Sequence, residues 1–344
     1  MLQIDSSAGG QIFRTSIGIA ALTGKAVKIS NIRADRPQPG LKAQHLTALE
    51  TVARLCNASL EGAKLASKEI SFSPKETIGG NFAVNIGTAG SITLLLQSAQ
   101  FPALLRETKL HIIGGTNVAW SPPIEFLQHS LLPVLNFMGG KFTLKINNYG
   151  YYPKGQGSVG FSSKPAKLPL KPIQITELGS LEFIKIFSHC ASLPKAVALN
   201  QCKAAKNSLQ QLNVDFEEIV ECKEQAATIG SSITLFAYFS TGAVISANSL
   251  GAKGKPAEQV GKEAAQRLLQ ELNPKKPVDS HLADQLVPYM ALAKGNSAIG
   301  CTALTEHCLN NIAVCEQLLG VKFTVKGEKE KPATLSVQGA AFKS

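Results

Sequence analysis

The sequence predicts a protein of mixed α/β class (α+β, two-layer), with helices covering one face of several sheets. An apolar helical stretch followed by a lysine and an alternating strand recurs in IAALTGKAVKISNI, FPALLRETKLHIIGG, VLNFMGGKFTLKIN and EQLLGVKFTVKG. These strands alternate apolar and polar residues, as at Phe323 and Val325, so one face of each sheet is expected to be buried. The 344 residues, 44% of them hydrophobic, suffice for one large core or two smaller ones.

The composition changes at two places, and these predict a second domain. Proline and lysine mark both PAKLPLKPIQITELG and ELNPKKPVDS, and the stretch between them has helix and strand patterns of its own. We therefore expect residues 179–276 to form a smaller inserted α/β domain. Residues 1–178 and 277–344 would form the larger, repeat-built domain.

The charge favours polyanionic partners. Lys and Arg total 35 against 24 Asp and Glu, which gives a net charge of +11, and the pI is about 9.3; nucleic acid or nucleotide phosphates fit this balance. The seven cysteines contain no CxxC pair and follow no signal-like start, so a reducing cytoplasmic setting without disulfides is expected. No apolar run reaches the roughly 18 to 20 residues of a membrane span, so no membrane association is expected.

Two glycine-containing loops precede apolar helices, in SAGGQIFRTSIGIAAL and GTAGSITLLLQSAQ. Such loops can aim free backbone N–H groups and the positive helix end at an anion, although the glycines could also serve only to turn a strand into a helix. The GxGxxG match at residues 155–160 is followed by no amphipathic helix, and no GxxxxGK[ST] element occurs. A dinucleotide-binding fingerprint and a P-loop are therefore excluded.

A basic loop leads into a helix in NIRADRPQPGLKAQHLTALETVARLC. Arg33, Arg36 and Lys42 lie before a helix that is expected to begin near Gln44 and His45. Guanidinium groups beside a helix start suit phosphate oxygens. The same residues are also compatible with a solvated surface loop.

The segment VDSHLADQLVPYMALA predicts a helix capped by Asp279 or Ser280. Its buried face would carry Leu282 and Leu286, which leaves His281 and Gln285 one turn apart on another face. Polar side chains at a helix start could hold a base or a ribose, or they could simply be exposed.

A single histidine stands at the start of the helix predicted from TEHCLNNIAVCEQLLG. Cys308, Ile312, Cys315 and Leu319 form its apolar stripe, so His307 lies beside the helix entrance rather than in the core. A positive helix end disfavours the charged imidazole, which keeps the ring neutral and nucleophilic at pH 7. The alternative is a capping or surface residue. A Cys/His metal site is excluded because Cys308 and Cys315 face the apolar stripe.

Taken together, eight motifs resemble the RNA 3'-terminal phosphate cyclase family in order and spacing, over nearly the whole chain. They are GGQIFRTS, IRADRPQPGLKAQHLTAL, GTAGSITLLLQ, GGTNVAWSPP, GYYPKGQG, GKPAEQVGKEAA, HLADQLVPYMALA and EHCLNNIAV. The resemblance implies three pseudo-repeated βαβαββ units, each a four-stranded sheet with two helices, and a smaller α/β domain inserted before the last unit.

The resemblance also implies a chemistry, that of a ligase-type, nucleotidyl-transferring enzyme. His307 would attack the α-phosphate of ATP, AMP would pass to an RNA 3'-phosphate, and the neighbouring 2'-OH would displace it to leave a 2',3'-cyclic phosphate. A divalent metal, Mg²⁺ or Mn²⁺, is implied without assigned ligands. The matching positions are Gln97, His281, Leu282, Ala283, Asp284 and Gln285 for ATP, and Arg14, Arg33, Arg36, Gln44 and His45 for phosphate.

Two positions depart from the family pattern. The usual DGSxGEGGGQ is DSSAGGQ here, which lacks the glutamate, and the usual GGTD has Asn117 in place of the acid. If those acids bind the metal, binding or rate would be reduced, or another carboxylate such as Asp284 would serve.

Three other functions remain as alternatives. A non-catalytic cyclase-like factor in ribosome assembly is disfavoured by His307, which such relatives lack. A small-molecule transferase related to enolpyruvyl transferases is disfavoured by the basic charge. A general nucleic-acid-binding module is disfavoured because aromatic residues make up only 6% and no stacking motif is present.

Overall fold

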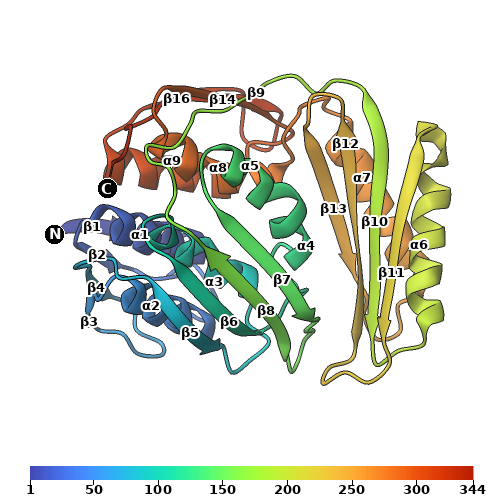
Figure 1. Ribbon diagram of the computed structural model, residues 1–344, viewed down its shortest axis with the longest axis horizontal. Helices are drawn as coiled ribbons and strands as arrows, with labels where there is room; N and C mark the ends of the chain where they lie inside the picture. Colours follow the sequence, from blue (N-terminus) through green and yellow to red (C-terminus); the bar gives the residue numbers. More distant parts are fainter. Residues whose placement is uncertain (344) are drawn as a thin grey trace.

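Residues 1–343, which the computed structural model describes, form four sheets of four strands each, with helices packed on one face of each sheet (Figure 1). The predicted mixed α/β class is confirmed. Among these residues, no helix is both long and apolar enough to cross a membrane.

Three of the sheets have the same strand order. The first runs β1 (Leu2–Asp5), β2 (Val27–Ser30), β4 (Ile70–Ser73), β3 (Ser59–Glu61). The second runs β5 (Gly80–Asn85), β6 (Thr108–Gly114), β8 (Gly157–Ser163), β7 (Phe142–Asn148). The third runs β9 (Gln174–Ile175), β14 (Asn296–Cys301), β16 (Ala333–Gln338), β15 (Phe323–Lys326). In each, the first two strands are parallel and the other pairings antiparallel.

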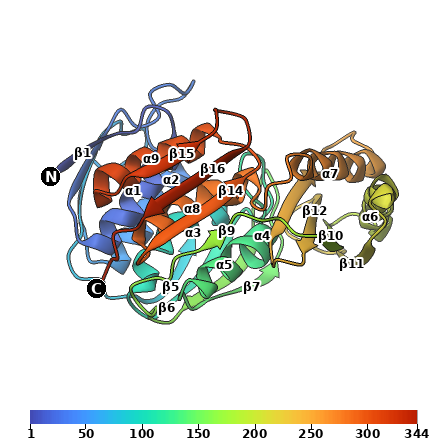
Figure 2. The ribbon, with the colours of Figure 1, turned by 90° about the horizontal axis from the view of Figure 1, so that it is seen from above.

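The helices of these three sheets pack against one another at the centre, as Figure 2 shows from above. The first sheet carries α1 (Gly10–Thr23) and α2 (Ala43–Leu55), and the third carries α8 (Ser280–Leu292) and α9 (Glu306–Leu319). The second carries α3 (Ile92–Ala99), the short η1 (Pro102–Leu104), and the run α4 (Ile124–Phe126), η2 (Leu127–Leu131) and α5 (Leu132–Phe137).

Helix α1 is the most enclosed of these elements. Every residue from Gln11 to Leu22 is buried, including four polar ones, because α2, α3 and α9 all pack on this helix. Gly18 permits this packing, because a Cβ there would lie 2.3 Å from the ring of Phe101. The helix ends at Gly24 in the left-handed conformation, with φ of 70°.

The fourth sheet has a different order, β11 (Asp215–Lys223), β10 (Leu181–Ala191), β12 (Gly230–Phe239), β13 (Val244–Leu250). With α6 (Lys195–Leu209), η3 (Gln210–Leu212) and α7 (Ala257–Leu272) it encloses a hydrophobic core of its own. These elements lie between β9 and α8 in the chain. They therefore follow β9, the first strand of the third sheet, whereas the resemblance implied an insertion before the whole last unit. Strand β9 pairs with β14 over only two residues, which is too short to leave a clear sequence pattern.

A buried polar cluster joins the two cores. Glu125 Oε1 lies 2.7 Å from His189 Nε2, and Asn117 Nδ2 donates to Glu125 Oε2 (2.9 Å) and to Ser232 Oγ (3.1 Å). The hydroxyl of Tyr151 contacts His189 Nδ1 from the side of the first core. We call these five residues the seam cluster. They hold the β10–β13 sheet against the α4 region.

Candidate active site

The candidate site lies where α1, α2, α3 and α9 come together. Thr15 Oγ1 donates to Asn311 Oδ1 (2.7 Å), which ties α1 to α9 in the second turn of each helix. Gln44 Oε1, in the first turn of α2, accepts a hydrogen bond from the N–H of Ser91, the N-cap of α3 (3.1 Å). Helix starts leave backbone N–H groups free and carry partial positive charge. This part of the protein is therefore suited to an anion.

Arg14 stands at the centre of this region with only neutral partners. Its Nε donates to Gln97 Oε1 (2.7 Å) and its Nη2 to Gln11 Oε1 (3.1 Å). Burial, and then the charge of Arg33, lower the pKa of Arg14 to about 10, so it stays charged at pH 7. The Nε2 of Gln11 is buried and has no hydrogen-bond partner among the described residues. A buried cation without a counter-ion favours binding of a negatively charged ligand.

The basic loop after β2 brings two further arginines to the same place. Arg33 is half-buried and its Nη1 donates to the carbonyls of Gln38 (2.8 Å) and Gly40 (2.9 Å), which fixes the loop. Arg36 is exposed and lies over the glycine loop, because a Cβ on Gly9 would be 3.2 Å from its Nη2. Within residues 1–343, neither these two arginines nor Arg14 forms an ion pair with Asp or Glu.

His45, in the first turn of α2, is held as a neutral hydrogen-bond donor. Burial, followed by Arg14, Arg33 and Lys42, lowers its pKa to about 3. The Lys42 N–H donates to His45 Nδ1 (3.2 Å), so the proton of the neutral ring is on Nε2. That atom points at the start of α1, since a Cβ on Gly10 would lie 2.5 Å from it. His45 thus adds an N–H group beside Arg14.

His307 is exposed in the first turn of α9, at the predicted helix start. Desolvation by surrounding residues, then the charges of Arg14, Arg36 and His281, hold the pKa of His307 below its usual 6.5. Cys308, Ile312 and Cys315 are buried as predicted, whereas Leu319 is half-buried. The ring is therefore neutral at pH 7, open to a ligand and close to two arginines.

Helix α8 supports this region from behind. Asp279 is its N-cap, as predicted, and accepts from the Leu282 N–H (2.8 Å). His281 is exposed and Gln285 half-buried, so their side chains are the ones in this motif that can reach a ligand. Leu282, Ala283 and Asp284 are buried.

Asp284 contacts α9 and not the solvent. Its carboxylate accepts a hydrogen bond from Thr305 Oγ1, and Thr305 in turn caps α9 by accepting from the Cys308 N–H (3.0 Å). Its carbonyl accepts from Asn311 Nδ2 (2.6 Å). Burial raises the pKa of Asp284 to about 8, although the Thr305 bond opposes the rise. Asp284 therefore positions the helix that carries His307.

The described residues do not form a protein metal cage. No group of three or more His, Cys, Asp or Glu side chains in residues 1–343 is arranged to hold a metal ion. Asp284 is buried, and its carboxyl group accepts a hydrogen bond from Thr305. Asn117 belongs to the seam cluster, where its amide donates two hydrogen bonds that an aspartate could not. Its departure from the family pattern thus has a structural role in this cluster.

The sequence did not single out Gln11, Thr15, Thr305 or Asn311, although all four hold the site together. Only Thr305 left a local signal, as a threonine three residues before the first buried helical position. Thr15 and Asn311 act through partners that are distant in the sequence, whereas Gln11 contacts Arg14 one turn away on α1.

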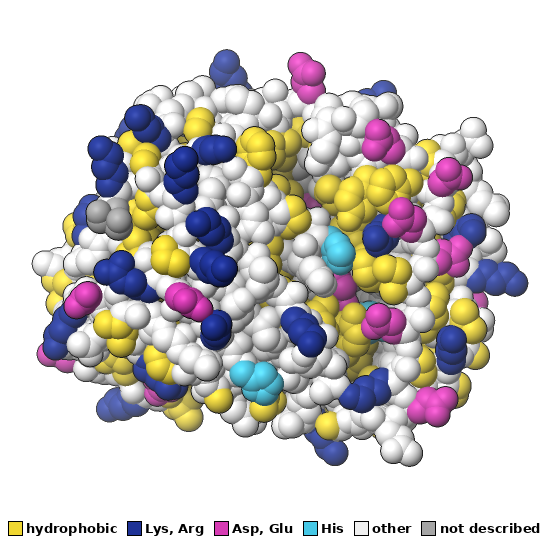
Figure 3. Space-filling model, viewed as in Figure 1, with side chains coloured by type: hydrophobic (Ala, Val, Ile, Leu, Met, Phe, Trp, Pro, Cys, Tyr) yellow, Lys and Arg dark blue, Asp and Glu magenta, His cyan; other side chains and the backbone are white. Residues whose placement is uncertain are grey.

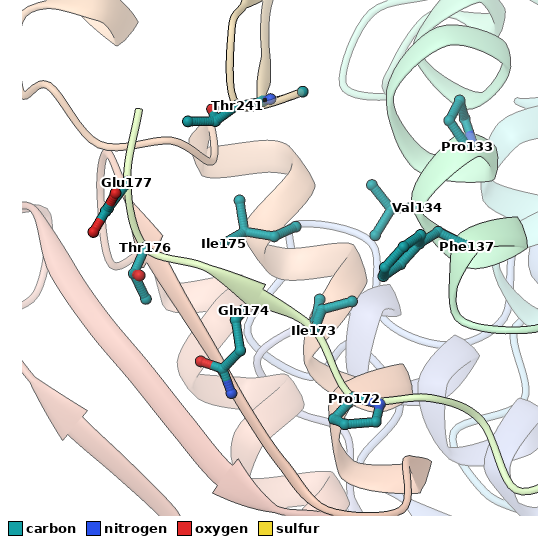
Figure 4. A pocket seen from close by; sticks show the side chains of 12 residues that line it. Pro133, Val134, Phe137, Pro172, Ile173, Gln174, Ile175, Thr176, Glu177 and Thr241 are labelled. Carbon is teal, nitrogen blue, oxygen red and sulfur yellow. Dashed lines mark hydrogen bonds between the residues drawn. The ribbon is translucent and has the colours of Figure 1, made fainter. Parts of the chain in front are cut away.

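Two wider surface features lie outside this group of residues. On the face in Figure 3, acidic side chains are most frequent over the β10–β13 part, and hydrophobic side chains line the hollow between the two parts. An open cavity of about 760 Å³ is lined by α5, the β9 stretch and the β12–β13 turn (Figure 4). Its lining includes none of the candidate site residues.

Comparison with known proteins gives consistent matches over the full length. The RNA 3'-terminal phosphate cyclase of Methanopyrus kandleri is 40% identical over 348 residues, covering 98% of this chain and 99% of that protein. The cyclase of Methanosarcina barkeri is 45% identical over 332 residues, covering 95% and 97%. The enolpyruvyl transferase NikO of Streptomyces tendae aligns with a TM-score of only 0.38 at 12% identity, covering 98% of this chain and 48% of its own, which is too weak to bear on fold or function.

A family model described as RNA 3'-terminal phosphate cyclase matches residues 6–325. This match spans the glycine loop, the basic loop, the HLADQ helix and the histidine helix. The chain therefore belongs to the RNA 3'-terminal phosphate cyclase family.

Proposed function

We propose that this protein uses ATP to convert the 3'-terminal phosphate of RNA into a 2',3'-cyclic phosphate, with AMP carried on His307. One observation carries the proposal: an exposed, neutral imidazole at a helix start, beside arginines that have no carboxylate partner. Family membership supports the same reaction. A non-catalytic scaffold would have no need to hold the nucleophile neutral and accessible.

The reaction divides into three transfers at phosphorus. A nitrogen of His307 attacks the α-phosphorus of ATP and pyrophosphate leaves. An oxygen of the RNA 3'-phosphate then attacks that phosphorus, and the neutral histidine leaves. Finally the 2'-OH attacks the activated 3'-phosphorus, loses its proton, and AMP leaves. Covalent activation replaces one difficult step with easier ones, because an unactivated phosphate monoester is a poor electrophile.

The surrounding residues supply charge and orientation. Arg14 and Arg36 would neutralise phosphate oxygens, with Gln97 fixing the Arg14 guanidinium. The Nε2–H of His45 would donate to an equatorial oxygen. His281 and Gln285 would contact the nucleoside. A Mg²⁺ or Mn²⁺ ion would be held mainly by the triphosphate, since the described side chains form no cage for it, and it would supply further charge neutralisation.

The overall reaction can be tested with an oligoribonucleotide labelled in its 3'-terminal phosphate. With ATP, the label should become resistant to phosphatase. An otherwise identical oligomer with a 3'-hydroxyl should remain unchanged. Formation of the cyclic end without ATP, or no reaction with any 3'-phosphate oligomer, would contradict the proposal.

Adenylylation should keep its full rate at pH values slightly below 6.5, where an ordinary histidine would already be protonated. A lowered pKa keeps the imidazole unprotonated to lower pH, so the acid limb of the pH–rate profile should have its midpoint below 6.5. Arg36→Gln removes one cause of the shift and should move the midpoint upward. Arg54→Gln, at the far end of α2, should leave it in place. An unmoved midpoint in Arg36→Gln would contradict the assigned electrostatics.

Gly10→Ala should reduce adenylylation roughly 10- to 100-fold, because the added Cβ would displace His45 and Arg14. It would lie 2.5 Å from His45 Nε2 and 2.9 Å from Arg14 Nη1. The clash should also lower stability, because both displaced side chains are buried, so the rates are compared under conditions where the variant and its control are fully folded. Gly160→Ala is the control, because a Cβ there meets nothing closer than 4.0 Å. Equal rates in both variants would refute the placement of these two side chains.

We further propose that the three sheets of common strand order are repeats of one unit, and that residues 179–276 form an inserted domain. The shared order of strands and helices supports the first point. The separate hydrophobic core of β10–β13, α6 and α7 supports the second.

A further inference from the structure

We propose that Cys190 and Cys222 form a reversible intramolecular disulfide, so that the β10–β11 pair is a site of oxidation. The two cysteines lie directly opposite each other in the parallel register of these strands. Neighbouring strands are about 4.8 Å apart, within the roughly 4.4 to 6.8 Å that separates the Cα atoms of disulfides. The backbone therefore already places the pair at bonding range.

Both side chains point to the same face of the sheet, beneath the start of α6. Two residues before Cys190, Ser188 Oγ donates to the Ala198 carbonyl of α6 (2.8 Å). Four residues before Cys222, Glu218 binds Lys206 of the same helix (2.6 Å). Because side chains alternate along a strand, Cys190 and Cys222 share this face with those residues.

The two sulfur atoms also meet at one acceptor. Cys222 Sγ lies 3.2 Å and Cys190 Sγ 3.7 Å from the carbonyl oxygen of Leu193. Burial, and then the hydrogen bond and charge of Cys222, raise the pKa of Cys190 to about 12. The shared contact with Leu193 and the direct register of the two residues both bring the sulfurs together.

The two cysteines differ in exposure, and this indicates which of them reacts first with a peroxide. Cys222 is half-buried and meets the oxidant first, whereas Cys190 is only 2% exposed. The Cys222 thiolate attacks hydrogen peroxide and becomes a sulfenic acid, with loss of hydroxide. The Cys190 sulfur then attacks the Cys222 sulfur, the S–S bond forms and water leaves. Two thiols are oxidised and one peroxide is reduced to water.

The bond is expected to be reversible. Disulfides bring their Cβ atoms to about 3.8 Å, closer than the spacing of neighbouring strands, so closing this one strains the sheet. Strained disulfides are the more easily reduced ones. Within a reducing compartment such a pair responds to oxidant without serving as a permanent structural link.

The other thiols lack this arrangement. Cys202 Sγ lies 3.3 Å from the carboxylate of Glu218, which is its hydrogen-bond partner. The remaining four, Cys56, Cys301, Cys308 and Cys315, are fully buried in the first core, out of reach of a solvent oxidant.

The test is peroxide treatment of the full-length protein, followed by alkylation after denaturation and peptide mapping. The parent should lose two of its seven free thiols, yield a peptide that links residues 190 and 222, and recover both thiols with dithiothreitol. Cys190→Ser and Cys222→Ser should each yield no linked peptide. Cys202→Ser, a buried cysteine on the same helix layer, should behave as the parent. Recovery of residues 190 and 222 unlinked from oxidised parent protein would overturn the proposal, as would linkage through a different pair.

Discussion

His307→Ala is expected to abolish transfer of label from [α-³²P]ATP to the protein, at least about 10³-fold, because removal of the attacking nucleophile eliminates the covalent route. The variant should remain folded, since the His307 side chain is exposed and the cap of α9 is made by Thr305 instead. The protein adduct in the parent should be acid-labile, as a histidine phosphoramidate is. Denaturing gel analysis after incubation with ATP and a divalent metal measures it.

His111→Ala is the matched control for the loss of a histidine. His111 is exposed on β6 and its ring contacts Ser158 Oγ (2.9 Å), away from the candidate site. It should label as the parent does. In a second experiment, His307→Ala is given RNA that already carries AMP on its 3'-phosphate. Cyclisation should then proceed, because the last step does not use the nucleophile. Persistent labelling of His307→Ala would assign the adduct to another residue and refute the mechanism.

Glu125→Ala should lower the free energy of unfolding by about 3 to 5 kcal/mol, because it removes a buried carboxylate and leaves its buried hydrogen-bond partners unpaired. Glu125 and His189 are 1% and 2% exposed, and the loss would also strand the Asn117 amide. Urea denaturation followed by circular dichroism measures the change. Lys331→Ala, which breaks an exposed pair with Glu328, should leave stability unaltered.

The effect should depend on pH. Burial alone would raise the pKa of Glu125, but the charge and hydrogen bond of His189, with Asn117, outweigh it and hold the pKa below 4.5. A depressed carboxyl pKa contributes stability above the unfolded value, and the contribution is lost as pH falls through the folded value. The difference between parent and Glu125→Ala should therefore shrink only below about pH 4.5. A constant difference down to pH 3 would contradict an ionised Glu125.

Local patterns were sufficient to predict the histidine helix and the α8 cap. The spacing of Cys308, Ile312 and Cys315 marked one buried face, and an aspartate before an apolar repeat marked the start of α8. Helix periodicity and capping depend on neighbours in the sequence, so a single chain displays them. Three of the positions drawn from the resemblance, Arg14, Gln97 and His45, lie close together at the start of α1.

What could not be predicted depends on partners far along the chain. Asp284 has the residue type of a ligand contact, yet its partner Thr305 makes it a support for α9. Asn117 seemed to weaken a metal site until Glu125 and Ser232 supplied a different role for its amide. Residue type indicates which interactions a side chain can make, whereas long-range packing decides which partner it meets.

The hydrogen bond from Thr15 to Asn311 joins residues 296 positions apart, and the same two helices carry Arg14 and His307. A nascent polypeptide that has not yet been translated as far as α9 contains Arg14 but lacks His307. Under the proposed function, adenylylation would thus require translation through α9, and chains interrupted before that helix could not consume nucleotide.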